Sequence, residues 1–198
     1  GGILLKEVVP RLLVIPSQEE LLFLFDSGRI ATLPVEELPA HPASNPIDWE
    51  TAPIPNAPQA GDQLACLAPI SNLALADYFL QISQRGYIKK IRMALAPSIM
   101  ENHYIGRGAK ISHDRPHDLA LCRADERYVL VSKMGYLQYV PVDLSPHAIV
   151  EAIHLKSADR LAAAFALPEG KSVLVMTQIG KAIHRTPESL EMVADLGR

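Results

Sequence analysis

Cysteine is scarce in this sequence, which has two cysteines, Cys66 and Cys122, among its 198 residues. The two lie far apart, without the paired spacing of a zinc site or the cysteine density of a secreted disulfide scaffold. We therefore expect two buried thiols in a cytoplasmic protein, and neither a metal nor another cofactor.

Long apolar runs are also missing. No run approaches the roughly 20 residues that a membrane-spanning helix needs, and the first ten residues, GGILLKEVVP, do not resemble a signal peptide. We expect no membrane contact. Because the sequence starts without methionine, we expect either residues added by cloning or a piece of a longer chain. Apolar residues make up 48% of the composition, which is enough for a sizeable core.

Positive charge is in short supply overall, with 19 Lys and Arg against 22 Asp and Glu, a net charge of −3. Its distribution is uneven: residues 1–77 have three basic and ten acidic residues, residues 78–133 have ten and five, and residues 134–198 have six and seven. A local excess of cations is what one polyanion-binding face requires, whereas the total argues against indiscriminate nucleic-acid binding. A solvated surface of mixed sign is the alternative interpretation.

The sequence contains a fourfold repeat, in which four stretches align on a glycine. They are LLFLFDSGRIATLPVEEL around Gly28, YFLQISQRGYIKKIRMAL around Gly86, YVLVSKMGYLQYVPVDL around Gly135 and SVLVMTQIGKAIHRTPESL around Gly180. Each is an apolar strand, a short polar turn that ends in glycine, and a second strand. Glycine supplies the positive φ of a tight turn at little steric cost, so the pattern predicts four β-hairpins.

Each hairpin is preceded by a further apolar segment, at residues 11–15, 63–70, 118–124 and 160–167. The last is rich in alanine and would suit a helix, but we expect a strand because a repeat should keep its class in every copy. Shorter strands are expected at residues 2–6, 108–112 and 150–156. Each unit thus supplies roughly four strands, enough for one propeller-type blade.

A proline-rich insertion separates the first two units. Its six prolines between residues 39 and 58 exclude regular central strands, apart from a possible strand near residues 47–51. We interpret the insertion as a loop that crosses between blades. Trp49, the only tryptophan, is expected to cover the side of a blade rather than to recognise a ligand.

These repeats resemble the C-terminal domain of the A subunit of bacterial DNA gyrase and its counterpart in topoisomerase IV. Blades of that family follow the pattern D-x-[ILV]-[ILV]…[ILV]-[ILV]-[ILV]-x-[ST]-x-x-G-x-[ILV]-[KR]-[KR]. The best-matching segments are EVVPRLLVIPSQEELLFLFDSGRIATLPVEELPA, DYFLQISQRGYIKKI and SVLVMTQIGKAIHRT. The resemblance extends over residues 3–193.

The resemblance implies an all-β fold, a β-propeller-like β-pinwheel of about four four-stranded blades in a single domain over residues 1–198. The expected blades span about residues 3–38, 47–97, 106–145 and 149–193. It also implies a non-catalytic domain that wraps duplex DNA without sequence preference. The implied partners are duplex DNA, the remainder of the A subunit and the ATPase B-type subunit, and the implied location is the bacterial nucleoid in the cytoplasm.

Matching this sequence to the family's hairpins gives a set of expected DNA-binding residues. They are basic residues in or beside the four turns: Arg29, Arg85, Lys89, Lys90, Arg92, Arg107, Lys110, Lys133, Lys181, His184 and Arg185. Cations on strand edges can reach phosphates without any base contact. For each of these residues the alternative is a solvent-exposed cation that binds no ligand and prevents its strand from pairing with the edge of another sheet.

The sequence departs from the family in one motif. Supercoiling gyrases have the basic box Q-R-R-G-G-K-G, whereas this sequence has only YIGRGAKI at residues 104–111. The resemblance therefore implies weak or partial wrapping. Continuation of the family pattern beyond the sequence end, EMVADLGR, would make this a fragment of a domain with more blades.

Two other functions were considered from the residues. In the segment SHDRPHD, His113, Asp114, His117 and Asp118 resemble metal ligands, but Pro116 disfavours the helix on which such a spacing would converge. No phosphate-binding P-loop and no nucleophile elbow is present. The remaining alternative is a propeller that binds protein through the acidic residues 1–77. Cations in one continuous row would favour DNA, and scattered cations would favour a protein scaffold.

Overall fold

The four glycine-centred hairpins form as expected. The computed structural model describes residues 15–38, 61–70, 73–142, 148–176 and 180–190. The hairpins are β1 (Glu20–Phe25) with β2 (Ile30–Pro34), β4 (Tyr78–Ser83) with β5 (Tyr87–Arg92), β7 (Arg127–Ser132) with β8 (Leu137–Pro141), and β11 (Val173–Met176) with β12 (Ala182–Arg185). The glycine of each turn has a positive φ, between 79° and 89°, which confirms the reason for its presence.

Three of the preceding segments also form strands: β3 (Leu64–Pro69), β6 (Pro116–Cys122) and β10 (Leu161–Ala166). The strand assignment of the alanine-rich segment is thereby confirmed. Each of these strands, however, pairs antiparallel with the hairpin that precedes it, β3 with β1, β6 with β4 and β10 with β7. The expected grouping, in which each strand belongs to the hairpin that follows, is wrong. We call β3, β6 and β10 the donated strands.

The strands make four antiparallel sheets. Sheet I has the order β2-β1-β3, sheet II has β6-β4-β5-β9, sheet III has β10-β7-β8, and sheet IV has β11-β12. The fourth strand of sheet II, β9, is short (Val150–Glu151) and pairs with the start of β5. Among the described residues, therefore, only sheet II has the four strands expected of every blade.

Other local expectations are corrected or untested. Residues 108–112 form no strand, because Gly106 and Gly108 both have a positive φ, which extended strands exclude. The strand expected at residues 150–156 is limited to β9. Within the described residues, the remaining elements are a helix, α1 (Ala96–Asn102), and three 3₁₀ turns at Val35–Glu37, Leu73–Leu75 and Met93–Leu95. The strands expected at residues 2–6 and 47–51, Trp49, and residues 11–14 of the first segment lie outside the described residues.

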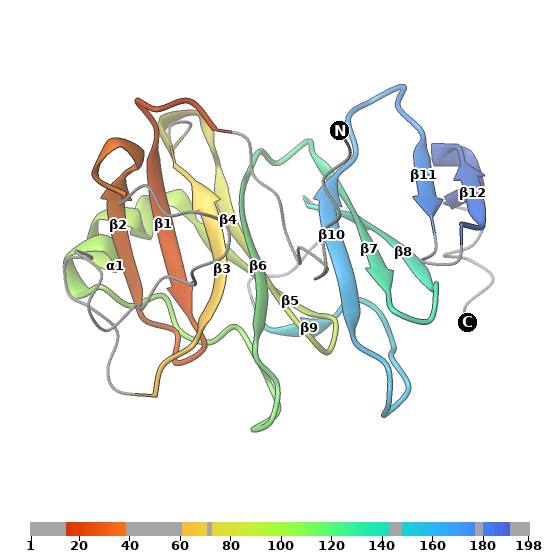
Figure 1. Cartoon of the computed structure of the whole chain (residues 1–198), viewed down its shortest axis with the longest axis horizontal. Coiled ribbons are helices and arrows are strands. Elements are labelled where there is room, and N and C mark those ends of the chain that lie inside the picture. The colour runs from red at the N-terminus through yellow and green to blue at the C-terminus, as the bar shows by residue number, and fades with distance from the viewer. Residues whose placement is uncertain (1–14, 39–60, 71–72, 143–147, 177–179, 191–198) are drawn as a thin grey trace, which may run out of the picture.

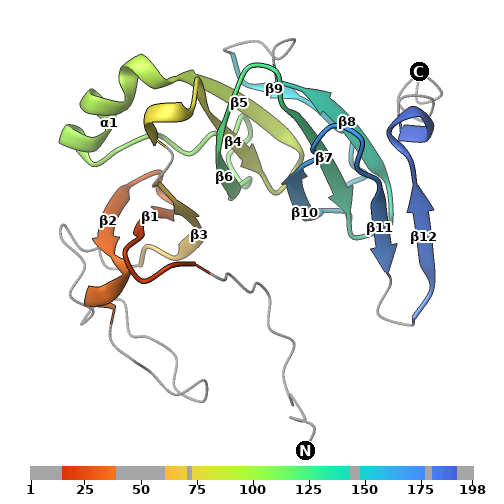
Figure 2. The ribbon, with the colours of Figure 1, turned by 90° about the horizontal axis from the view of Figure 1, so that it is seen from above.

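The four sheets follow one another along the molecule. Figure 1 shows them side by side along the longest axis, and Figure 2, seen from above, shows that they follow an arc with sheet I at one end and sheet IV at the other. In the part of the chain that the structure describes, no helix is long and apolar enough to cross a membrane.

Apolar clusters join each sheet to the next. One cluster lies between sheets I and II and includes Leu22, Phe79 and Ile91. A second lies between sheets II and III and includes Leu80 and Leu130. A third joins sheets III and IV. Because central strands are covered on both faces, their sequences are largely apolar. Each fully buried Leu, Ile or Phe contributes about 1.5–3 kcal/mol relative to exposure.

The two cysteines lie in these clusters and are confirmed as buried free thiols. Burial, with a smaller effect from the nearby Glu126 carboxylate, raises the pKa of the Cys122 thiol from 9.0 to about 12. Cys122 is thus protonated at neutral pH and serves as a small apolar side chain.

Candidate nucleic-acid interface

The hairpin turns of sheets I, II and III have the same construction. In each, the N–H of the glycine donates to the carbonyl three residues earlier, at 2.9 Å for Gly28 and 3.0 Å for both Gly86 and Gly135. The turns lie at one end of their sheets, which we call the turn edge: residues 26–29, 84–86, 133–136 and 180–181, with the connecting residues 107–115 and 155–160 beside them.

A buried aspartate connects two of these turns to their donated strands. Asp114 precedes β6, and one of its carboxylate oxygens, Oδ1, accepts the backbone N–H of Arg85 at 3.0 Å. Asp159 precedes β10, and its Oδ1 accepts the backbone N–H of Met134 at 3.2 Å. Both aspartates are 1% exposed. Neither carboxylate is therefore exposed at the turn edge.

The residue after each of these aspartates is an arginine, and both arginines lie at the turn edge. The Asp114 carboxylate also accepts the N–H of Arg115 at 2.9 Å, and the Asp159 carboxylate accepts that of Arg160 at 2.8 Å. Sequence reasoning missed both arginines. The repeated Asp-Arg pair before β6 and β10 is the signal that could have found them.

Contacts along the turn edge run without a break from sheet I to sheet II. The Arg115 guanidinium donates to the side-chain oxygen of Gln63 at 2.8 Å and lies 3.6 Å from the carboxylate of Asp26, in the turn of sheet I. The carbonyl of the same arginine accepts the N–H of Gln84, in the turn of sheet II, at 2.8 Å.

The same edge continues from sheet II to sheet III. The carbonyl of Lys156 accepts a hydrogen bond at 2.9 Å from the Arg85 guanidinium in the turn of sheet II. The carbonyl of Arg160 accepts the N–H of Lys133, in the turn of sheet III, at 2.9 Å. Five basic residues of the turn edge are exposed, and four more are partly buried. The exposed ones are Lys110, Arg115, Lys133, Lys156 and Lys181, and the partly buried ones are Arg29, Arg85, Arg107 and Arg160.

A polar hollow of about 480 Å³ lies at the sheet I end of this edge. Its lining includes Ser27, Asp62, Arg107 and His113. The guanidinium of Arg107 donates through Nη2 to the carbonyl of Asp114 at 2.7 Å, while its buried Nε has no hydrogen-bond partner. The hollow therefore combines cationic groups with carboxylates and lacks an apolar wall.

Lys90 does not lie at an exposed edge, and that expectation is wrong. Side chains alternate along β5, so Lys90 shares a face with Ile88, which packs between sheets II and III. The lysine is 5% exposed. Its ammonium donates to the carbonyl of Val142 at 2.9 Å and lies 4.7 Å from the centre of the Tyr78 ring. It is buried with its hydrogen bond satisfied and cannot contact a phosphate without leaving the core.

Arg85 also has a structural role that the sequence did not indicate. Its guanidinium donates to four backbone carbonyls of the segment that leads into β10: those of Leu155, Lys156, Ser157 and Asp159, at 2.6–3.2 Å. The five N–H donors of arginine suit such a cluster of carbonyls. The group expected to bind phosphate is instead engaged within the protein.

The remaining expected residues divide by position. Arg29, Arg107, Lys110, Lys133 and Lys181 lie at the turn edge. The other four lie away from it: Lys89 within β5, Arg92 at the far end of β5, and His184 and Arg185 at the end of β12. The structure therefore does not bring all eleven residues to one surface.

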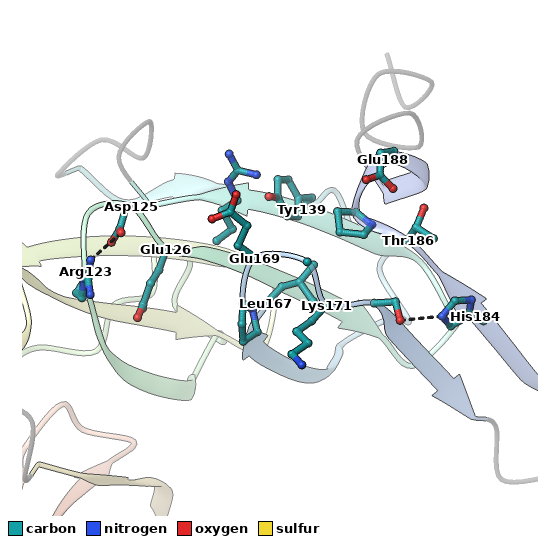
Figure 3. Close-up of a pocket in the computed structure, with 15 residues that line it drawn as sticks. Arg123, Asp125, Glu126, Tyr139, Leu167, Glu169, Lys171, His184, Thr186 and Glu188 are labelled. Atoms are coloured by element: carbon teal, nitrogen blue, oxygen red, sulfur yellow. Dashed lines mark hydrogen bonds and ion pairs between the residues drawn. The ribbon is translucent and has the colours of Figure 1, made fainter.

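The end of the molecule opposite the turns has a different character. A hollow of about 940 Å³ lies there between sheets III and IV (Figure 3). Its side chains carry both signs of charge: Arg123 and Asp125 form an ion pair at 2.8 Å, and Glu169 and Lys171 lie on the same loop. His184 is hydrogen-bonded to Ser172 at 2.8 Å. Such a mixture of charges does not favour a polyanion.

The segment SHDRPHD shows no metal centre. The carboxylate of Asp114 is hydrogen-bonded to backbone N–H groups, and that of Asp118 accepts the N–H of Leu119 at 2.9 Å. Within the described ranges, no group of three or more His, Cys, Asp or Glu side chains is placed to hold a metal ion.

Comparisons with known proteins give matches in structure only. No protein-family model matches the sequence, and no curated protein matches it. Among solved structures, the C-terminal domain of DNA topoisomerase IV superposes with a TM-score of 0.60 at 20% identity, over 87% of this chain and 55% of that one. The C-terminal domain of DNA gyrase A gives 0.65 at 13% identity, over 85% and 54%.

A third similar structure is the C-terminal domain of E. coli ParC, with a TM-score of 0.58 at 18% identity, over 89% of this chain and 72% of that one. This chain thus spans little more than half the length of the first two. At these identities the likeness shows the fold alone, and it confirms the β-pinwheel that the sequence resemblance implied.

Proposed function

We propose that this chain is a non-catalytic DNA-binding domain of a type II topoisomerase A subunit, of the gyrase or topoisomerase IV kind. It binds duplex DNA through phosphates, without sequence preference, and bends the DNA along its surface. Its partners are then duplex DNA, the remainder of the A subunit and the ATPase B-type subunit, in the cytoplasm at the nucleoid. The shared fold supports the proposal, and the basic residues of the turn edge are its main evidence.

The basic residues that gather at the turn edge are the observation that favours DNA. Three turns are linked by hydrogen bonds through Arg115, Arg85 and Arg160. Three exposed lysines, Lys110, Lys133 and Lys156, lie in these turns or in the segments beside them, and the sheets that bear them follow an arc (Figure 2). A protein-binding propeller would not require cations to gather at one end of its sheets. The phosphates of a bent duplex form a similar curved row of charges, which such an edge can neutralise.

Sequence-independent contact follows from the elements that the described chain offers. Its single α-helix, α1, has seven residues and contains neither lysine nor arginine. A major-groove reader needs a helix or ribbon that brings side chains to base edges. Cations on turns reach phosphates instead, and phosphate contacts position DNA without reading its sequence. Wrapping should be weak, because two of the expected cations, Arg85 and Lys90, are engaged inside the protein.

A salt titration tests the proposal directly. Binding of two unrelated duplexes of equal length is measured by fluorescence anisotropy from low to moderate salt. Neutralisation of about 4–6 phosphates gives a slope of about −4 to −5 in log K against log salt, and we expect equal affinity for both duplexes. A slope near zero, or a strong preference for one duplex, would contradict phosphate binding.

A further inference from the structure

The segment that follows α1, residues 103–106, pairs with the turn of sheet I. Tyr104 and Arg29 form an antiparallel bridge, and the N–H of Ile105 donates to the carbonyl of Gly28 at 3.0 Å. Residues directly opposite each other in an antiparallel pair have neighbouring side chains on one face. The side chain of Tyr104, which is 54% exposed, therefore lies beside that of Arg29.

Gln81 of β4 holds the same segment from the side of sheet II. The glutamine is fully buried, and its Nε2 donates to the carbonyl of Gly106 at 2.6 Å. A Cβ at Gly108 would lie 2.4 Å from Cδ of the Gln81 carboxamide, so the backbone here lies directly on the glutamine. Residues 106–108 are thus fixed between sheets I and II.

Lys89 of β5 reaches the same place. It pairs with Gln81 across the hairpin and shares a face of β5 with Ile91, which packs between sheets I and II. A Cβ built at Gly106 would lie 4.0 Å from the Lys89 Nζ and 4.0 Å from Cε1 of Tyr104. The absent side chain of Gly106 therefore leaves a space bordered by an ammonium group and a phenol ring. We call this space the Gly106 site.

The positive charge around the Gly106 site is not compensated within the described residues. Lys89 is partly buried, and its ammonium has no hydrogen-bond or ion-pair partner there. The buried Nε atoms of Arg29 and Arg107 also lack a hydrogen-bond partner. The carboxylate of Asp26, in the adjacent turn, lies against Arg115 instead. Buried cationic donors without partners are costly, and an anionic ligand removes that cost.

We propose that the Gly106 site binds one phosphate of the DNA backbone. The Lys89 ammonium donates to a phosphate oxygen in a charge-assisted hydrogen bond of about 2.7–2.9 Å, and the Tyr104 hydroxyl is the second donor. Tyrosine is among the side chains that contact phosphates without reading bases. Arg29 and Arg107 add positive potential.

The inference rests on the proposed function and extends the interface beyond the turn edge. Because residues 103–106 pair with the turn of sheet I, a duplex that follows the turn edge can reach the Gly106 site. The inference adds Tyr104, which no motif in the sequence indicated. It also returns Lys89 to the interface, although this lysine lies within β5.

Two conservative variants test the site by salt titration with a fluorescent duplex. Lys89→Met keeps the length of the side chain and removes its charge, so the slope of log K against log salt should become shallower by about one unit. Tyr104→Phe removes only a hydroxyl. It should weaken binding about three- to tenfold with an unchanged slope, because a neutral group releases no counterion. Lys171→Met, at an exposed position near the opposite end, is the charge control.

A pair of glycine variants tests the space itself. Gly106→Ala places a methyl group in the site at a φ of 83°. Gly170→Ala introduces comparable backbone strain at a φ of 71°, where a Cβ meets nothing within 4 Å. Both should lose similar stability in thermal unfolding, but only Gly106→Ala should weaken DNA binding. If Gly106→Ala fails to fold, the Lys89→Met and Tyr104→Phe variants decide.

These measurements separate the site from the proposed function. If the native chain binds DNA with the expected slope while Lys89→Met and Tyr104→Phe bind as the native chain does, the Gly106 site is wrong and the proposed function stands. An equal change of slope in Lys171→Met would overturn the site as well.

NMR titration of the Gly106 and Gly108 amide resonances identifies the source of the phosphate. Duplex DNA should shift both resonances in the native chain, and Lys89→Met should reduce the shifts. Inorganic phosphate should shift them only at much higher concentration. Saturation by inorganic phosphate without any response to DNA would assign the site to a free phosphate and overturn the DNA contact. No shift with either ligand would overturn the site altogether.

Discussion

The carboxylate of Asp159 accepts the backbone N–H of Met134 at 3.2 Å, and this bond connects the start of a donated strand to the turn of the hairpin that the strand completes. Asp114 and Arg85 repeat the relationship in sheet II at 3.0 Å. A single carboxylate thereby holds three parts of a sheet in register. The same geometry places an arginine after each aspartate at the turn edge.

The first prediction concerns Asp159 and pH. Burial raises the pKa of its carboxyl. Hydrogen bonds from Ser132, Arg160 and Met134, together with the charge of Arg85, lower the pKa by more than burial raises it, so it lies below its ordinary value. The stabilisation is therefore present above about pH 4 and is lost as pH falls through the folded-state pKa. Asp159→Asn should lower the free energy of unfolding at pH 7 by about 1–3 kcal/mol.

Urea denaturation at pH 7 and pH 3 measures this effect. The native chain should lose more stability on acidification than the Asp159→Asn variant. The control is Asp125→Asn, which breaks an exposed ion pair with Arg123 and should cost less than about 1 kcal/mol. Parallel pH dependence of native chain and variant would refute the role assigned to Asp159.

The second prediction compares two turn glycines. Gly86 and Gly135 have φ values of 83° and 88°, so alanine at either position costs about 1 kcal/mol in backbone strain. A Cβ at Gly86 would also lie 2.4 Å from the Ile153 side chain and 2.8 Å from its carbonyl oxygen, whereas one at Gly135 meets nothing within 4 Å. Gly86→Ala should destabilise the protein by at least about 1 kcal/mol more. Equal thermal unfolding of the two variants would contradict this.

The third prediction separates stability from DNA binding at Arg85. Arg85→Ala removes hydrogen bonds to four carbonyls and should cost about 2 kcal/mol or more. Arg85→Lys should not restore it, because an ammonium lacks the fork of the guanidinium. Lys133→Ala, at an exposed position, should change stability by less than about 0.5 kcal/mol. If DNA affinity falls more for Arg85→Ala than for Lys133→Ala while both are folded, Arg85 contacts DNA after all.

The fourth prediction locates the DNA interface. The triple substitution of Lys110, Lys133 and Lys156 by alanine, all exposed at the turn edge, should make the salt slope shallower by about 2–3 units. The matched control replaces Arg92, Arg123 and Lys171 by alanine. These residues are exposed and lie away from the turns, and their replacement removes the same amount of positive charge. Fluorescence anisotropy on one duplex measures both. A larger effect of the control would move the interface to the opposite end and restore Arg92 as a contact.

The sequence by itself determined the hairpins. A glycine that ends a polar turn between two apolar runs allows the positive φ that a tight turn requires. The turn involves only four or five successive residues, so the constraint acts locally. The alanine-rich segment at residues 160–167 could be recognised as a strand only from its place in the repeat, because its own composition would suit a helix. The exception is residues 108–112, which form no strand because Gly108 and the nearby Gly106 both have a positive φ.

The tertiary structure decided which hairpin each donated strand completes and which cations reach solvent. Lys89 and Lys90 are adjacent, yet only Lys90 is directed into the core, because its face of β5 is covered by sheet III. Arg85 is engaged because residues 155–159, distant in sequence, pass beside its turn. Strand pairing and burial depend on contacts between segments tens of residues apart, and a repeat that looks the same in every unit cannot specify which neighbouring unit supplies them.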